Sequence, residues 1–251
     1  MKAKCAIVRE LGKNYRNCIS SHPLHHTLNM SKAKKQHYSY CETLSNLGLE
    51  VIKLLPIDDK PDACFVEDTA VVQGKRAFVT RMAKESRRGE DVEVEKLLEE
   101  FFDVKRAFSP ATIEGGDVIH LPSHLISGVT QRTNMEGVAQ MRSWLKVQVD
   151  TIVDNAIVHL KSYVNYIGKK TILVTMAYQN HPCLEKFYSI VIPNEEYYAT
   201  NCLIIEGAVI MSTKFPNVVE LVKETGFEVL SLDMSEFEKC EGALTCLSLI
   251  F

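Results

Sequence analysis

Three carboxylates lie close together in the sequence between residues 62 and 68. Asp62 precedes a short apolar run, and Glu67 and Asp68 directly follow that run. Neighbouring carboxylates repel one another, so Glu67 and Asp68 on a strand are costly unless a cation lies against them. The spacing therefore indicates a site for a positively charged group, and the alternative is a solvated strand end.

A second acidic motif and a histidine have the chemistry for proton transfer. Glu114 and Asp117 flank two glycines, which permit close backbone approach or a positive φ. The acids suit a cation or a histidine partner, and His159 follows later in the chain with an ordinary pKa of about 6.5, which suits proton transfer. The alternatives are a plain turn at the acidic motif and a buried core histidine.

Two arginines and a cysteine extend this set. Arg87 and Arg132 are natural bidentate partners for a carboxylate, although exposed arginines are common. Cys246 lies in a strand-like run near the end of the sequence. A cysteine combined with a distant histidine, here His159, is typical of a thiol nucleophile with a general acid/base. The alternative is a buried cysteine in a closing strand.

The remaining cysteines and histidines give little sign of a metal or disulfide site. The chain has 8 cysteines without a Cys-x-x-Cys pair, and several lie in apolar runs, where cysteine behaves as a small buried hydrophobe. His22, His25 and His26 have no cysteine or carboxylate at metal-ligand spacing. We therefore expect no metal, no disulfide framework and mostly inert core cysteines.

The composition is that of a globular protein of 251 residues, with 46% hydrophobic residues and a net charge of -3. This charge balance argues against a nucleic-acid-coating protein, which usually has a strongly basic face. No apolar run approaches the roughly 20 residues that span a bilayer. The first nine residues do not resemble a signal peptide. We therefore expect a cytoplasmic protein with neither a nucleic-acid nor a membrane partner.

Pairs of strand-like runs joined by short polar turns recur along the chain and must position these side chains. Their starts lie about 40–50 residues apart, a spacing typical of repeat architectures. The predicted hairpins span residues 64–81, 116–132, 159–176 and 201–213. The predicted helices span residues 31–47, 90–102, 135–148 and 216–225, and the strands that follow them span residues 49–55, 103–108, 149–153 and 227–232.

The two ends of the sequence predict one more unit. Residues 5–9 and 245–251 are both strand-like, and pairing between them would close a ring. The tight hairpins disfavour a purely parallel sheet, because hairpins join antiparallel strands. The pattern predicts a single α/β domain over residues 1–251, built from about five similar units, and the alternative is a generic α/β fold.

Four short motifs occur in a set order along the chain. They are Phe65-Val66-Glu67-Asp68, Glu114-Gly115-Gly116-Asp117, His159-Leu160-Lys161-Ser162 and Leu244-Thr245-Cys246. This ordered set resembles the dimethylarginine dimethylaminohydrolase family of the guanidino-group-modifying superfamily, over most of the chain. The resemblance implies a five-bladed α/β propeller (pentein) of ββαβ units around a central active site.

The resemblance also implies a role for each candidate residue. Cys246 matches the nucleophile, His159 the general acid/base, and Glu114 the acid that orients the histidine. Asp68 matches the residue that binds the guanidinium of the substrate, with Glu67 and Phe65 beside it. Arg87 and Arg132 match the pair that binds the α-carboxylate. Asp62 and the backbone carbonyl of Cys240 match the groups that bind the α-amine.

The implied reaction is hydrolysis of an Nω-methylated L-arginine to citrulline and methylamine or dimethylamine. A guanidinium is a resonance-stabilised cation and a poor electrophile, so Asp68 must fix it before Cys246 attacks as a thiolate. His159 would protonate the departing amine and then activate the water that hydrolyses a covalent thiouronium on Cys246. This chemistry needs neither a metal nor a cofactor, and its partner is a small guanidino substrate.

The resemblance leaves alternatives open. Arginine deiminases are similar but carry His-x-Asp, whereas this chain has His159-Leu160-Lys161, which favours methylated arginines. An arginine deiminase is the main alternative, followed by an amidinotransferase and a non-catalytic arginine-binding protein. Residues 19–26 do not resemble the family's usual substrate-covering lid. A homodimer through the edge where the terminal strands meet is also open.

Overall fold

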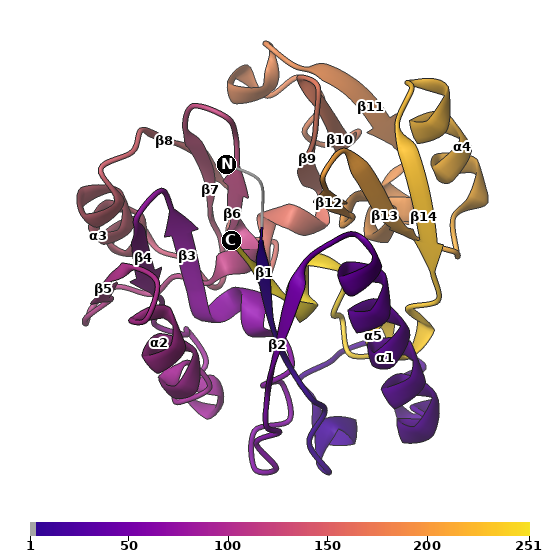
Figure 1. Ribbon diagram of the computed structural model, residues 1–251. Helices are drawn as coiled ribbons and strands as arrows, with labels where there is room; N and C mark the ends of the chain where they lie inside the picture. Colours follow the sequence, from indigo (N-terminus) through magenta and orange to yellow (C-terminus); the bar gives the residue numbers. More distant parts are fainter. Residues whose placement is uncertain (1–3) are drawn as a thin grey trace.

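In the computed structural model, which describes residues 4–251, the strands form five three-stranded sheets arranged around a common centre (Figure 1). In each sheet the middle strand is antiparallel to one neighbour and parallel to the other. This is the arrangement of a five-bladed α/β propeller, so the fold predicted from the sequence is confirmed.

Strands and short helices alternate along the chain. The strands are β1 (Cys5–Arg9), β2 (Glu50–Leu54), β3 (Ala70–Gln73), β4 (Arg76–Val79), β5 (Asp103–Arg106), β6 (Val118–His120), β7 (Leu125–Val129), β8 (Val149–Val153), β9 (Val164–Gly168), β10 (Thr171–Thr175), β11 (Tyr188–Ile192), β12 (Leu203–Ile205), β13 (Ala208–Ser212), β14 (Glu228–Leu232) and β15 (Leu249–Ile250). The α-helices are α1 (Met30–Asn46), α2 (Val92–Leu98), α3 (Met135–Leu145), α4 (Pro216–Glu224) and α5 (Ser235–Glu238). The strand orders in the sheets are β15-β1-β2, β3-β4-β5, β6-β7-β8, β11-β10-β9 and β12-β13-β14.

The first and last strands complete one blade together. Strand β1 is antiparallel to β15, with Ile7 opposite Leu249, and is parallel to β2. Strands β1 and β15 therefore lie side by side at the centre of the propeller (Figure 1). The predicted ring closure by the terminal strands is confirmed, although β15 is shorter than the predicted strand.

Tight turns join the antiparallel strands within the predicted hairpins. Gly74 between β3 and β4 has φ 62°, and Gly207 between β12 and β13 has φ 92°. Glycine adopts this left-handed region without the steric cost of a Cβ atom. The glycines that mark the turns in the sequence therefore fix the ends of these hairpins.

One blade departs from the predicted pattern. Between β10 and β11 the chain forms only a 3₁₀ turn, Pro182–Leu184, in the place where the other blades have an α-helix. The sequence pattern contains no helix in this region, and it also missed strand β11. The short connection is sufficient because β11 lies directly beside β10, with which it is parallel.

Apolar side chains pack between the sheets and the outer helices. The largest cluster joins Val8 of β1, Tyr40 and Leu44 of α1, Ile210 of β13 and Phe237 of α5. This packing holds α1 and α5 against the blade that contains both chain ends. Within residues 4–251, no helix combines the length and the apolar character that crossing a membrane requires.

Candidate active site

Four 3₁₀ turns at the centre of the propeller carry or directly follow the predicted residues Phe65, Glu67, Asp68, Glu114, His159 and Cys246. The turns are Val66–Thr69, Gly115–Asp117, Leu160–Ser162 and Thr245–Leu247. The sequence predicts Glu67, Asp68 and Cys246 on strands, and this prediction is wrong. Local hydrogen bonds close the turns; for example, the Thr69 hydroxyl donates to the Val66 carbonyl at 2.6 Å.

The two glycines after Glu114 allow these turns to pack together. A Cβ atom at Gly115 would collide with the Glu67 carbonyl. A Cβ atom at Gly116 would lie 2.7 Å from Nδ1 of His159 and 3.0 Å from Oδ1 of Asp68. The Gly116 N–H instead donates to Asp68 Oδ1 at 2.9 Å. Glycine is therefore required here by a close approach to Asp68 and His159.

His159 lies between two carboxylates. Its Nε2 is 2.8 Å from Oε2 of Glu114 and 3.7 Å from Oδ1 of Asp68. Burial alone would lower the pKa of His159, but Asp68 and Glu114 outweigh burial and raise it to about 9. The second oxygen of Glu114 accepts the Ala83 N–H at 3.1 Å. Glu114 is thus fixed in place, and it favours the protonated imidazole.

Cys246 faces the same cavity as His159 and is only 8% exposed. Burial, and then the negative charges of Glu67 and Asp68, raise the pKa of its thiol well above the ordinary value. The substrate-free protein therefore holds Cys246 as a thiol. A cation bound beside Asp68 would favour the thiolate, because an opposite charge stabilises the ionised form.

Glu67 connects three of the turns from behind the cavity. Its carboxylate accepts from Lys161 Nζ at 2.5 Å and from the Thr245 hydroxyl at 2.6 Å. Burial is the main reason that the pKa of Glu67 is raised, and Lys161 opposes this effect. Sequence reasoning missed the pairing of Glu67 with Lys161, since nothing in either motif shows which side chains meet.

Arg87 is bound to carboxylates of the protein. Its Nη1 donates to Asp68 at 2.8 Å, and its Nε and Nη2 donate to Glu90 at 3.1 and 2.9 Å. Burial raises the pKa of Glu90 to about 7, although Arg87 opposes this effect. Burial also opposes ionisation of Asp68, but His159 and Arg87 outweigh it and lower the pKa of Asp68. Sequence reasoning missed Glu90, because it begins a charged stretch that is typical of a solvated helix.

Arg132 and Asp62 both line the cavity, and they differ in how far the protein supplies hydrogen-bond partners for their side chains. Among the described residues, buried Nη1 of Arg132 has no hydrogen-bond partner, and its nearest carboxylate oxygen, on Glu114, is 3.9 Å away. Asp62 is buried and accepts the Ile19 N–H at 3.2 Å. Burial is the main reason that the pKa of Asp62 is raised. Arg132 thus offers a cationic donor that is free to bind an anion.

The structure brings most of the predicted site residues to a single cavity of about 50 Å³. Glu67 and Glu114 are the exceptions, and they hydrogen-bond to Lys161 and His159, respectively. The predicted residues that line the cavity are Asp62, Phe65, Asp68, Arg87, Arg132, His159, Cys240 and Cys246.

One expectation about the cysteines is wrong, because a disulfide joins Cys18 and Cys240. The partners are separated by 222 residues, so no local spacing reveals the pair. Nε2 of His25 lies 3.2 Å from the Cys18 sulfur. These three side chains have the atom types of a metal site, but the two sulfurs are bonded to each other.

Asp68, Glu114 and His159 form a second cluster with potential metal ligands. His159 hydrogen-bonds to Glu114, and Arg87 Nη1 lies 2.8 Å from Asp68 and 3.7 Å from Glu114. The protein itself therefore supplies positive charge to these carboxylates.

The chain resembles known proteins over nearly its whole length. The family described as "N,N dimethylarginine dimethylhydrolase, eukaryotic" matches residues 14–247. The N(G),N(G)-dimethylarginine dimethylaminohydrolase of Pseudomonas aeruginosa is 33% identical over 226 residues, which cover 88% of this chain and 89% of the relative. The protein of the same name from Streptomyces coelicolor is 31% identical over 253 residues, or 99% of this chain and 97% of the relative.

Solved structures show the same likeness. A Cys-to-Ser mutant of DDAH from Pseudomonas aeruginosa, complexed with citrulline, superposes over the full length of both chains with a TM-score of 0.96 and 30% identity. An adduct of a dimethylarginine dimethylaminohydrolase with S-methyl-L-thiocitrulline gives a TM-score of 0.95 at 31% identity, covering 99% of this chain and 100% of the other.

Proposed function

Because this chain belongs to the dimethylarginine dimethylaminohydrolase family, we propose that it hydrolyses Nω-methylated L-arginine to citrulline and methylamine or dimethylamine. One observation carries the proposal: Cys246, His159 and Asp68 line the same cavity. They supply a nucleophile, a proton donor and an anion for a cationic substrate. The relatives' names and their citrulline and thiocitrulline ligands support the same substrate class.

The cavity wall has partners for each charged group of such a substrate. Asp68 would hold the guanidinium, and the free Nη1 of Arg132 would bind the α-carboxylate together with Arg87. Asp62 and the backbone carbonyl of Cys240 would bind the α-amine. Phe65 would pack against the aliphatic part of the substrate, since it lines the cavity.

The first half of the reaction forms a bond between Cys246 and the guanidinium carbon. The cationic substrate lowers the pKa of Cys246, which loses its proton to solvent and attacks as a thiolate. The carbon–sulfur bond forms, and the bond from carbon to the methylated nitrogen breaks. Protonated His159, held by Glu114 at 2.8 Å, gives its proton to that nitrogen, which leaves as a neutral amine.

The second half releases citrulline. Neutral His159 takes a proton from a water molecule, which attacks the thiouronium carbon. The carbon–sulfur bond breaks, the hydroxyl of the intermediate becomes the carbonyl of citrulline, and its proton returns through solvent to the departing thiolate of Cys246. His159 is protonated again. Glu114 holds the imidazole in one orientation through both steps, so one histidine serves first as acid and then as base.

The pairing of Lys161 with Glu67 supports the choice of a methylated substrate. Arginine deiminases carry an aspartate where this chain has Lys161, and that second aspartate leaves little room for methyl groups. Here Nζ of Lys161 donates to Oε1 of Glu67 at 2.5 Å, and Lys161 does not line the cavity. Asp68 would therefore hold the guanidinium without a second aspartate opposite it.

The test is citrulline formation by the purified protein, assayed with the Cys18–Cys240 disulfide intact and reduced, with asymmetric dimethylarginine and arginine in parallel. We expect turnover of the methylated substrate, and a loss of about a thousandfold or more in Cys246→Ser. Cys183→Ser is the matched control, because Cys183 is a free, half-buried cysteine that does not line the cavity. Citrulline from arginine alone would indicate a deiminase, and transfer of the amidino group to added glycine would indicate an amidinotransferase. Citrulline from neither substrate would refute the proposal.

We further propose that residues 1–251 act as one catalytic domain in the cytoplasm. Six cysteines of the described residues are unpaired, which fits a reducing compartment, although the disulfide of Cys18 does not. A homodimer through the edge of the terminal strands stays a prediction. Cell fractionation and light scattering would test these two points.

A further inference from the structure

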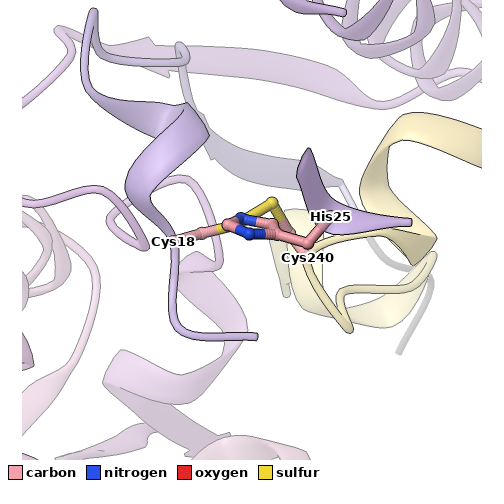
Figure 2. Close-up of side chains that lie close together, drawn as sticks. All are labelled: Cys18, His25 and Cys240. Carbon is pink, nitrogen blue, oxygen red and sulfur yellow. A yellow bond between two sulfur atoms is a disulfide. The ribbon is translucent and has the colours of Figure 1, made fainter. Parts of the chain in front are cut away.

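A disulfide links the segment over the cavity to the segment that leads to the proposed nucleophile. We call residues 18–28 the lid. Cys18 is followed by Ile19, which lines the cavity, and Cys240 is followed by Glu241 and Gly242, which line it too. Figure 2 shows that the two cysteines come from these two segments and that His25 lies beside their bond.

The cavity is too small for a substrate while the lid is in this position. Its volume of about 50 Å³ has room for only a few water molecules. Pockets for small ligands usually measure about 300–1,000 Å³. The Ile19 N–H also occupies Asp62, the carboxylate proposed for the α-amine. Substrate can therefore enter only if the lid moves.

Hydrogen bonds at the edge of the lid would not prevent that movement. The Ser20 hydroxyl donates to the Lys239 carbonyl at 2.7 Å, and the Ser21 N–H donates to Glu241 at 3.0 Å. These groups are partly or fully exposed, so water can replace each bond at a net cost of roughly 0.5–1.5 kcal/mol. The disulfide is covalent and does not open in this way, so it decides whether the lid can leave the cavity.

We propose that Cys18 and Cys240 form a redox-controlled latch, which holds the lid over the cavity when oxidised and releases it when a small dithiol reduces the bond. This inference rests on the proposed function, since it concerns entry of a guanidino substrate to the same site. The reduced protein is then the form that admits substrate.

The electrons for this step come from the dithiol. One thiolate of the dithiol attacks the Cys240 sulfur, the bond between the two protein sulfurs breaks, and Cys18 leaves. Nε2 of His25 lies 3.2 Å from the Cys18 sulfur, within hydrogen-bond reach of the departing thiolate, which takes up a proton from solvent. The second thiol of the reagent closes a cyclic disulfide and releases Cys240 as a thiol.

The test compares oxidised and reduced protein of known cross-link content. Peptide mapping measures the Cys18–Cys240 bond before and after treatment with dithiothreitol, with EDTA present to remove any metal held by the freed thiols and His25. We expect citrulline formation from asymmetric dimethylarginine to rise about tenfold or more on reduction. Cys18→Ser should match the reduced wild type with or without dithiothreitol, and Cys183→Ser should keep the wild-type response.

Two turnover results would overturn the latch. One is equal and measurable citrulline formation by the oxidised and reduced proteins, and the other is a dithiothreitol response that persists in Cys18→Ser, which would place the sensitive thiol elsewhere. Amide hydrogen exchange of residues 18–28 supplies a readout that does not need turnover. Exchange should accelerate by about tenfold or more on reduction. If it does so while neither form makes citrulline, the proposed function fails and the latch stands; unchanged exchange refutes the latch.

Discussion

Replacing Glu114 with glutamine tests how the protein keeps His159 protonated. Oε2 of Glu114 lies 2.8 Å from Nε2 of His159, and the carboxylate is fully buried, so water screens the contact little. Glu114→Gln keeps the shape of the side chain and an acceptor for the Ala83 N–H, but it removes the negative charge. The pKa of His159 should therefore fall.

The size of the fall follows from the surrounding charges. Asp68, Glu114 and Asp117 together raise the pKa of His159 from 6.5 to about 9, although burial opposes them. Glu114 acts on His159 both as a hydrogen-bond acceptor and as a negative charge, and Asp68 and Asp117 share the rest of the effect, so we expect about one pKa unit from Glu114, or about 1.4 kcal/mol. At pH 8, His159 would then be mostly protonated in the wild type and about half protonated in Glu114→Gln.

The assay is an NMR titration of the imidazole ¹⁵N and ¹H shifts. The signals of His159 are assigned as those that are absent from the spectrum of His159→Asn. Glu114→Asp is the matched variant, because it keeps the charge and should keep the pKa of His159 closer to 9. A pKa of His159 in Glu114→Gln that equals or exceeds the wild-type value would refute this account of the site.

The same contact makes stability depend on pH. A raised pKa of His159 in the folded state adds stability that is fully present below the unfolded value of 6.5 and is lost as the pH rises through about 9. The difference in unfolding free energy between the wild type and Glu114→Gln should therefore shrink over that range. Urea unfolding at several pH values measures it, and a difference that grows with pH would contradict the assigned charge state.

Three further substitutions test separate parts of the site. In Arg132→Gln the KM for dimethylarginine should rise about tenfold or more with a smaller change in kcat, because a buried cationic donor is lost. An unchanged KM in initial-rate kinetics would show that Arg132 does not bind the substrate. In Gly116→Ala the new Cβ atom would lie 2.7 Å from Nδ1 of His159 and must displace the imidazole ring. The kcat should therefore fall about tenfold or more, and a wild-type kcat would contradict this packing. Lys161→Met leaves Glu67 buried without its cation and should lower the unfolding free energy by about 3–5 kcal/mol. Burial raises the pKa of Glu67, so this loss should be smaller at pH 5 than at pH 8, because uptake of a proton removes the unpaired charge. A loss that urea unfolding finds equal at both pH values would show that Glu67 does not bear a charge.

Much of the fold could be predicted because its signals are local. Glycines at the turns, such as Gly74 and Gly207, mark where strands reverse, and apolar runs at both ends of the sequence indicate the closing pair. Strand β11 was missed because no helix precedes it to mark a crossover. The 3₁₀ turns were read as strands because a single turn is too short to show its own periodicity.

The site residues could be identified as a set, and the resemblance also implied the pairing of Glu114 with His159, but the other pairings could not be identified. Glu67 and Arg87 were candidates, yet their closest partners lie in another blade, as Lys161 does, or in a stretch that looks solvated, as Glu90 does. The disulfide was missed for a related reason. A cysteine in an apolar stretch has the same sequence pattern whether it is a buried thiol or bonded to a partner 222 residues away.

The most direct test of the central claim is the mass of the protein during turnover. Acid quenching of the reaction with asymmetric dimethylarginine, followed by peptide mapping, should find an adduct on Cys246 that equals the substrate minus dimethylamine. Arginine, if it reacts, must give the same adduct, because loss of ammonia leaves the same amidino group on sulfur. Citrulline formation with an unmodified Cys246, or with the adduct on another cysteine, would contradict the proposed mechanism.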